Sequence, residues 1–513
     1  MKKLILQLAF IVLAVNVVFI SAGYAATINS ASCSQSDVQA AITAASTGDT
    51  VIIPSGSCTW TSAVSLAKNI TLMGAGATNT IITVNASMQM GLGTWRVTGI
   101  GFIVGGSIDR VMSGGKMNNG WRVDHCTFTY SGAPAVKNSM VLVGYHDQPN
   151  RRAFGLFDNN TLTNVRVPLL YGGTYVDYTN PEWANSLGLG TADALFIENN
   201  TIINTIGSNY NTQPDANCGS RVVFRYNTID SFNSAMHSVQ GNNRAARMWE
   251  FYGNVYTSNA FPTWTVAQLR GGTGVAYNNT IGNGFTLTYF LLDNVRSYRN
   301  EAPPIGLCDG SNPLDGNRTG GHGYPCRDQI GRSTDDHQMT PTDFPAQSLS
   351  PAYFWNNKHG ANEVFAAVQG NGTNQGTYHI LANRDFYNYN ASFNGTTGVG
   401  SGLLANRPAT CTTNTSEVGG GVAYWATDTN TLYRCSATNT WTVHYKPYTY
   451  PHPLTGLAPV TPPPPPPPPP PPTTTVTLPP PPPPTTTVTP PPPQTSKIQE
   501  WFIRLKRIWK RIF

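Results

Sequence analysis

An asparagine that recurs after a short alternating strand restricts the fold of this chain more than any other feature. RVVFRYN ends at Asn227, MWEFYGN at Asn254 and GVAYNN at Asn279, at intervals of 27 and 25 residues. LFIENN and GLFDNN end in the same way at Asn200 and Asn160. Recurrence at this length, with strand-like alternation before each turn, is typical of the stacked coils of a solenoid. We therefore predict that these asparagines form a ladder at one bend.

Asparagine suits such a bend for a physical reason. A sharp turn between two strands leaves backbone N–H and C=O groups without partners, and burying such groups is costly. The asparagine amide can bond both the backbone and the amide of the next coil, and asparagine tolerates left-handed backbone angles. WRVDHC places Cys126 at the same position, and WRVTGI places Ile100 there. The alternative is that the N-N-T pairs are ordinary turns of an antiparallel sandwich.

The N-terminus has the pattern of an export signal over residues 1–25. Two lysines precede an apolar run from Leu4 to Ile20, and small residues follow near Ala25. A retained membrane anchor is the alternative. Export would place the mature chain outside the cell or in the cell envelope, which is an oxidising environment.

The eight cysteines are therefore candidates for disulfides. Cys126 is expected to be a buried thiol of the ladder, and Cys218 cannot be placed. No C-x-x-C motif or Cys/His cluster marks a metal site. We expect no cofactor, with Ca²⁺ as the one alternative but without a clear ligand cluster. Proximity in the sequence favours three pairs: Cys33 with Cys58, Cys308 with Cys326, and Cys411 with Cys435.

The charge distribution bears on the partner. The formal net charge is +6, but the last seventeen residues alone hold six Lys or Arg and a single Glu. The body is close to neutral, which argues against nucleic acid as a partner. With 49 Gly, 40% hydrophobic residues and only 11% charged residues, the composition suits turn-rich β structure.

The beginning of the mature chain carries a family resemblance. SQSDVQAAITAAS has a helical apolar face, with Ser36 and Asp37 as candidate caps, and would cover the open end of a solenoid. DVQAAI, GDTVIIPSG and ITLMGAG resemble the start of right-handed parallel β-helix proteins of the pectate-lyase-like superfamily, and the asparagine ladder is similar to theirs. RVVFRYNTID, with His237, Arg244 and WEFYGN after it, resembles an exported bacterial group of mostly unassigned activity. The resemblance implies an all-β, right-handed parallel β-helix over residues 27–400.

A small β module is predicted over residues 401–455. VAYWATDTNTLYRCSATNTWTVHY contains two alternating runs, which Cys411 and Cys435 could staple. Trp425 and Trp441, with Tyr433, are candidate platforms for stacking on sugar rings. The alternative is that these aromatic residues form the core of the module.

The C-terminal end is of low complexity and then basic. Residues 456–496 are a Pro/Thr-rich linker, which cannot bury a core and acts as an extended spacer. Residues 497–513 place Trp501, Leu505 and Trp509 at helical spacing between basic residues. This pattern predicts a basic amphipathic helix on a membrane surface, with docking to a protein as the alternative.

The resemblance also selects the residues of a candidate site. It places the ladder between the second and third strands of each coil, so that the groove-lining strand follows soon after. Coils lie about 4.8 Å apart, so a polymer could contact one residue or two from each. The strands so selected carry Tyr171, Tyr210, His237, Gln268, Arg270, Tyr289, Asp293 and Arg296.

Lyase cleavage of an acidic sugar polymer needs a base, a cation that stabilises the enolate-like charge, and an acid for the leaving oxygen. We predict His237 as the base, Arg270 or Arg244 as the cation and Tyr210 as the acid. In the alternative these residues only stabilise the fold, with the arginines paired to Asp230 or Glu250. Tyr171, Gln268, Tyr289, Asp293, Arg296, Trp425 and Trp441 are predicted to bind substrate.

A glycoside hydrolase would instead need two facing carboxylates. Asp193, Asp215, Asp230, Glu250 and Asp293 are candidates, but no spacing singles out a pair. The sequence thus favours an exported, lyase-like protein that acts on an acidic polysaccharide. The alternatives are a carbohydrate-binding or adhesive surface protein without catalysis, and an envelope or phage-type structural spike.

Overall fold

The computed structural model describes residues 25–456, except 115–119, 133–134, 144–152, 172–178, 180, 208–211, 238–243, 294–307, 309–325, 341, 370–375 and 416. The predicted export signal up to residue 24, the linker beyond residue 456 and the terminal helix lie outside this part. So do Tyr210, Arg296 and the side chain of Tyr171. Within the described residues, every helix is too short or too polar to cross a membrane.

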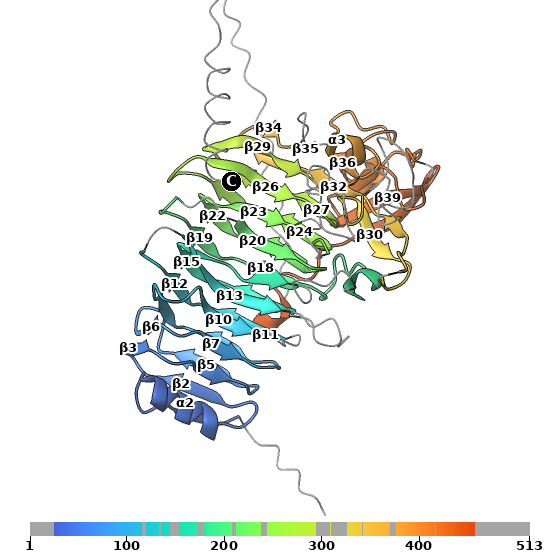
Figure 1. The fold of residues 1–513 in the computed structure, drawn as a ribbon. Coiled ribbons are helices and arrows are strands. Elements are labelled where there is room, and N and C mark those ends of the chain that lie inside the picture. The colour runs from blue at the N-terminus through green and yellow to red at the C-terminus, as the bar shows by residue number, and fades with distance from the viewer. Residues whose placement is uncertain are drawn as a thin grey trace, which may run out of the picture. The chain divides into compact units, whose positions relative to one another are not determined.

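Three sheets wind about one axis, and successive coils add one strand to each in the order A, B, C (Figure 1). Sheet A contains β1 (Thr27–Asn29), β2 (Thr50–Ile53), β5 (Thr71–Gly74), β8 (Arg96–Thr98), β11 (Trp121–Asp124), β14 (Gly155–Asp158), β18 (Leu195–Glu198), β21 (Arg221–Arg225), β24 (Met248–Tyr252), β27 (Thr273–Tyr277), β32 (Ala352–Trp355) and β36 (Phe386–Asn388).

Sheet B contains β3 (Gly56–Trp60), β6 (Thr80–Val84), β9 (Gly101–Val104), β12 (Thr127–Thr129), β15 (Thr161–Thr163), β19 (Thr201–Ile203), β22 (Thr228–Asp230), β25 (Val255–Thr257), β28 (Thr280–Ile281), β33 (Lys358–His359) and β34 (Asn362–Glu363). Sheet C contains β4 (Ser65–Leu66), β7 (Met88–Met90), β10 (Arg110–Gly114), β13 (Lys137–Val143), β16 (Val165–Arg166), β17 (Leu169–Tyr171), β20 (Thr212–Asn217), β23 (Asn233–Met236), β26 (Thr263–Leu269), β29 (Phe285–Leu292) and β35 (Ala366–Val368).

Pairing within these sheets is parallel between consecutive coils, except at the terminal pair of β33 and β34. The right-handed parallel β-helix that the sequence predicted is therefore confirmed, and the antiparallel sandwich is wrong. Parallel neighbours require a crossover of a dozen or more residues, and here the rest of each coil supplies it.

The asparagine ladder occupies the bend from sheet A to sheet B. The Asn227 amide donates to Asn254 Oδ1 at 3.1 Å, and Asn227 Oδ1 accepts from the backbone and side-chain amides of Asn200 at 3.0 Å. Asn160 and Asn279 repeat this pattern, and Asn357 extends it by one coil. Each side chain thus satisfies backbone groups that the bend leaves unpaired.

One detail of the ladder differs from the expectation. The left-handed backbone angle belongs to the residue before each ladder position rather than to the ladder residue itself. His125, Asn199, Tyr226 and Asn278 have φ values of 51°, 58°, 56° and 53°. The ladder position therefore uses the asparagine amide, whereas the preceding position needs a left-handed backbone that Asn, Gly, His and Tyr all adopt here.

Apolar side chains from all three sheets fill the interior of the solenoid. They stack coil upon coil, as in Trp95 on Trp121 and Phe102 on Phe128, with ring centroids 5.5 and 5.2 Å apart. Cys126 lies among them, and burial raises the pKa of its thiol to about 12. Its backbone N–H donates to Asn160 Oδ1, so Cys126 ends the ladder as a buried thiol, as predicted.

Helix α2 (Gln35–Ala44) covers the N-terminal end, where Val38, Ala41 and Ile42 are buried. Its N-cap is Ser34, whose hydroxyl accepts from the N–H of Asp37. The predicted caps Ser36 and Asp37 are therefore wrong, although the predicted buried face of the helix is right.

Three inserted structures flank the later coils. The 3-10 helix η1 (Pro181–Ala184) precedes β18, and a hairpin of β30 (Arg332–Asp335) and β31 (Gln347–Leu349) precedes β32. The short helix α3 (Gly376–His379) precedes β36. These insertions account for the uneven intervals between coils.

The C-terminal module packs on the outer face of sheet A. Its sheet consists of β37 (Val399–Gly402), β38 (Ala423–Ala426), β39 (Thr431–Ala437) and β40 (Thr440–Tyr445), with η3 (Leu404–Asn406) after β37. Residues 446–456, which include η4 (Pro453–Thr455), form a C-terminal strap. The strap crosses sheet A toward earlier coils: Arg225 donates to Tyr448 O and Thr449 O, and Arg122 to Leu454 O.

The three disulfides of the structure are those that proximity predicted: Cys33–Cys58, Cys308–Cys326 and Cys411–Cys435. Cys218, which the sequence left unplaced, is buried just after β20.

Glu250 joins the module to the solenoid. This buried residue of β24 accepts from the Gly190 N–H and the Tyr445 hydroxyl, both at 2.7 Å, and burial raises the pKa of its carboxyl from 4.5 to about 7. Between these pH values the folded chain binds a proton that the unfolded chain has lost, so stability should fall as pH rises through this range. Above pH 7 this loss is complete, and the shift corresponds to roughly 3 kcal/mol.

Glu250→Gln should remove this part of the pH dependence. Urea unfolding of both proteins at several pH values from about 4.5 to 8 measures the difference. Other titrating groups contribute equally to the two curves, so equal slopes for wild type and variant would contradict the assignment.

Candidate functional site

Four strands of sheet C end at one level. Ala216 pairs with Met236, Met236 with Leu269, and Leu269 with Leu292. The residues that follow continue the backbone hydrogen bonding of sheet C. The N–H groups of His237, Arg270 and Asp293 donate to Ala216 O, Met236 O and Leu269 O at 2.8, 2.8 and 3.1 Å. Asn217, His237, Arg270 and Asp293 thus form one row across four coils.

The structure confirms the predicted placement of His237 and Arg270 on neighbouring coils. The segments that the sequence selected around Tyr171, His237, Gln268 and Tyr289 contain strands of sheet C, namely β17, β23, β26 and β29. The segment selected around Tyr210 directly precedes β20 in the sequence.

A polar cluster crosses this face, formed by Asn138, Arg166, Asp215, His237 and Arg270. Arg166 donates to Asn138 Oδ1 at 2.9 Å and to Asp215 Oδ2 at 3.2 Å. Asp215 contacts His237 Nε2, and Arg270 Nη2 lies 2.8 Å from His237 Nδ1. The five residues come from successive coils and are all partly exposed or at the surface of the sheet.

The partners of His237 assign its tautomer. An ionised carboxylate can only accept, so Nε2 carries a ring proton toward Asp215. Burial by itself would raise the pKa of Asp215, but contact with His237 and the charges of Arg166 and Arg270 hold it below its usual value. Asp215 is therefore an anion that orients the ring, while Arg270 Nη2 lies close to both ring nitrogens, 2.8 Å from Nδ1 and 3.3 Å from Nε2.

The other predicted groove residues differ in exposure. Gln268 is partly exposed and donates to Asp293 Oδ2 at 3.4 Å. Asp293 itself is only 1% exposed, so it orients Gln268 rather than contacting a ligand directly. Tyr289 is partly exposed on β29.

Arg244 lies elsewhere, which corrects its prediction as a catalytic cation. Its side chain is 0% exposed, donates twice to Asp328 at 2.8 Å and contacts Asp335 at 3.0 and 3.2 Å. The guanidinium also lies 4.8 Å from the ring centre of Trp183. Arg244 is thus committed to a buried ion cluster that fixes the hairpin of β30 and β31.

The prediction that Trp425 stacks on sugar is also wrong. Trp425 is buried and packs against Tyr277 and Trp355 of sheet A, with ring centroids 5.1 Å from each. Trp441 is partly buried, and its indole N–H donates to Pro408 O at 2.8 Å. The alternative of a core role therefore holds for Trp425, and the indole N–H of Trp441 is engaged within the module.

The carboxylates considered for a hydrolase do not gather. Glu250 is buried under the module on sheet A, whereas Asp215 belongs to sheet C. Asp230 accepts from the backbone and side chain of Asn259 in a turn. No two of these described residues face one another across an open surface.

Sequence reasoning missed Arg166 and undervalued Asp215. Arg166 lies on β16, a two-residue strand that precedes the expected groove segment. The sequence did contain a sign that Asp215 belongs to the site, because it follows the predicted acid Tyr210 by five residues. Its value as a partner of His237 depends on the pairing of β20 with β23, which includes a register shift.

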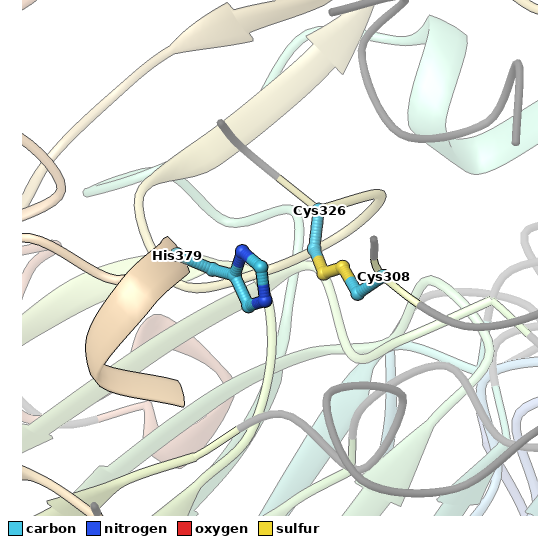
Figure 2. A group of neighbouring side chains, drawn as sticks. All are labelled: Cys308, Cys326 and His379. Carbon is cyan, nitrogen blue, oxygen red and sulfur yellow. A yellow bond between two sulfur atoms is a disulfide. The ribbon is translucent and has the colours of Figure 1, made fainter. Parts of the chain in front are cut away.

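One group of metal-ligand type occurs among the described residues. Cys308, Cys326 and His379 place their ligand atoms within 4.8 Å of one another (Figure 2). The two sulfur atoms are bonded to each other, so neither is a thiolate able to hold a metal. The group is a disulfide beside a buried histidine.

Two observations identify the architecture. Each coil contributes one strand to each of the parallel sheets A, B and C, and an asparagine ladder occupies the bend from A to B. The chain is a parallel β-helix of three sheets. In this fold the polar cluster lies on sheet C, the sheet that the resemblance selected for the groove.

Comparisons with known proteins find only distant structural similarity. No family model matches the sequence, and no curated protein matches it. Among solved structures, the PL6 family alginate lyase AlyGC is similar with a TM-score of 0.34 and 14% identity, over 70% of this chain and 57% of that one. A point mutant of AlyGC gives a TM-score of 0.36 and 10% identity, over 83% and 57%. The chain thus spans just over half the length of these enzymes.

Proposed function

We propose that the protein cleaves an acidic polysaccharide by β-elimination at the polar cluster on sheet C. The observation that carries this proposal is the position of His237, held between the Asp215 carboxylate and the Arg270 guanidinium on consecutive coils. A base beside a cation is what removal of a proton next to a carboxylate requires.

The chemistry begins with Arg270. In the free protein its guanidinium lies against the His237 ring, with Nη2 2.8 Å from Nδ1 and 3.3 Å from Nε2. When a uronate binds, its carboxylate attracts Arg270 and exposes Nδ1. Arg270 then neutralises the charge that develops on the carboxylate, which lowers the barrier to proton removal.

His237 Nδ1 takes the proton from C5 of the uronate. The electrons of the C5–H bond form the C4–C5 double bond, and the bond from C4 to the glycosidic oxygen breaks. Asp215 stabilises the resulting imidazolium through Nε2. The leaving oxygen takes a proton from Tyr210, the acid that the sequence predicts and whose position lies outside the described residues. No water is consumed.

The full exported chain should therefore release unsaturated oligosaccharides from at least one polyuronate. Two measurements follow the reaction: the absorbance of the new double bond and the number of reducing ends. The matched control is the same polymer after chemical reduction of its carboxyl groups to alcohols, which removes both the anchor for Arg270 and the acidity at C5. We expect no cleavage of the reduced polymer.

Other outcomes would contradict the proposal. New reducing ends without double-bond absorbance would indicate hydrolysis. Binding of polyuronates without release of any product would indicate the adhesive alternative instead.

A further inference from the structure

Three aromatic side chains reach the outer surface of sheet C, at an earlier level of its strands than the polar cluster. Trp264 on β26 and Phe365, which directly precedes β35, are each 44% exposed. Tyr289 on β29 is partly exposed. We call Trp264, Tyr289 and Phe365 the aromatic platform.

Strand pairing places the platform on three consecutive coils. Thr263 pairs with Phe285 and Thr265 with Leu287, so Trp264 lies opposite Thr286. Phe290 pairs with Ala366, so the preceding residues Tyr289 and Phe365 lie opposite one another. Consecutive coils are about 4.8 Å apart, so the rings cover a strip across β26, β29 and β35.

The fold does not explain why these rings are at the surface. Val266, Ala267 and Leu269 of the same strand fill the core, whereas Trp264 points away from it. A single exposed apolar residue needs no explanation, but exposed aromatic residues on three adjacent coils form a group that calls for one. The group lies on the same sheet as the polar cluster, a few residues earlier along the strands, so one extended polymer could contact both.

The surroundings of the platform define the chemistry of that ligand. Thr286 and Thr288 are exposed on the strand between Trp264 and Phe365, and Gln268 lies further along β26 before Arg270. Apolar faces next to hydroxyl, amide and guanidinium groups suit a sugar, which has C–H bonds on its ring faces and hydroxyls at its edges. An apolar protein segment would cover the exposed hydroxyls of Thr286 and Thr288 without offering them hydrogen-bond partners.

We propose that the aromatic platform is a stacking subsite for sugar rings of the same polymer that the polar cluster binds. The assignment of an acidic polymer rests on the proposed function, whereas stacking itself requires only a sugar. The platform would therefore have the sugar-stacking role that was predicted for Trp425 and Trp441. It extends the proposed binding face toward the last coils.

The test measures binding separately from cleavage. Affinity of the full chain for polyuronate oligosaccharides and for their carboxyl-reduced forms is measured by calorimetry, in a His237→Gln background that prevents turnover. Trp264→Ala should weaken binding by roughly ten- to thirty-fold for both forms, because a central tryptophan commonly dominates an interface. Trp264→Phe should retain most of the affinity, since it keeps an aromatic face.

A matched control comes from the C-terminal module. Leu403 is 53% exposed and distant from sheet C in the chain, so Leu403→Ala should bind as the parent does. Equal affinity of Trp264→Ala and its parent would overturn the platform, as would an equal loss in Leu403→Ala or no binding of any sugar by the parent. Loss of binding in Trp264→Ala without cleavage by the wild type would refute only the catalytic proposal and leave the platform intact.

Discussion

His237→Gln should lower the rate of polyuronate cleavage by about 100- to 10,000-fold, the range that a positioned general base contributes. Glutamine keeps a polar side chain of similar reach that can donate to Asp215 and accept from Arg270. It has no basic nitrogen that could take the proton from C5. The loss should therefore appear in kcat, while the melting temperature stays close to that of the wild type.

A histidine outside the site provides the control. His337 is exposed and contacts Asp336 and Asp343 on the surface before β31. His337→Gln should cleave at the wild-type rate. Cleavage by His237→Gln within a few-fold of wild type would remove His237 as the base, because no other described histidine lies in the polar cluster.

Arg244→Met should destabilise the fold by about 3 to 5 kcal/mol, the usual cost of removing one partner of a buried ion pair. Methionine preserves much of the side-chain volume but leaves Asp328 and Asp335 buried without their main cation. The pKa of Asp328 is held below its usual value chiefly because Arg244 outweighs the effect of burial. Without Arg244, burial would favour protonation of Asp328.

The measurement pairs urea denaturation with the cleavage assay. Arg270→Met is the matched variant, because Arg270 is partly exposed and should cost little stability while reducing cleavage strongly. The structure therefore predicts opposite signatures for two arginines that the sequence treated alike. Full stability of Arg244→Met together with lost cleavage would return Arg244 to the site.

The ladder shows why so much of the fold could be predicted from sequence. The side-chain amides of Asn227 and Asn254 bond both the backbone of the bend and the asparagine of the next coil. A stack of coils is the arrangement of strands that provides these partners at every repeat. Once that bend is known, counting along each coil locates sheet C. His237 and Arg270 could be placed on neighbouring strands for that reason.

The same counting could not separate Arg270 from Arg244. Both follow a strand or loop near His237, and only long-range partners distinguish them. Asp328 and Asp335 lie 84 and 91 residues after Arg244, in the insertion that contains the hairpin of β30 and β31 and has no coil periodicity. Trp425 was misjudged for a related reason: its alternating strand suits a sugar platform or a core, and the docking of the module on Tyr277 decides between them.

The C-terminal strap has a mechanical consequence. The described chain ends at Gly456, just after Leu454, whose carbonyl accepts a hydrogen bond from Arg122 on β11. Tension applied through the proline-rich segment would therefore enter the solenoid through sheet A at an early coil, and it would load the strap contacts of Arg122, Glu198 and Arg225 in succession. Arg225 lies on sheet A of the same coil whose sheet C strand leads into His237, so the load would reach that coil only after the earlier contacts of Arg122 and Glu198.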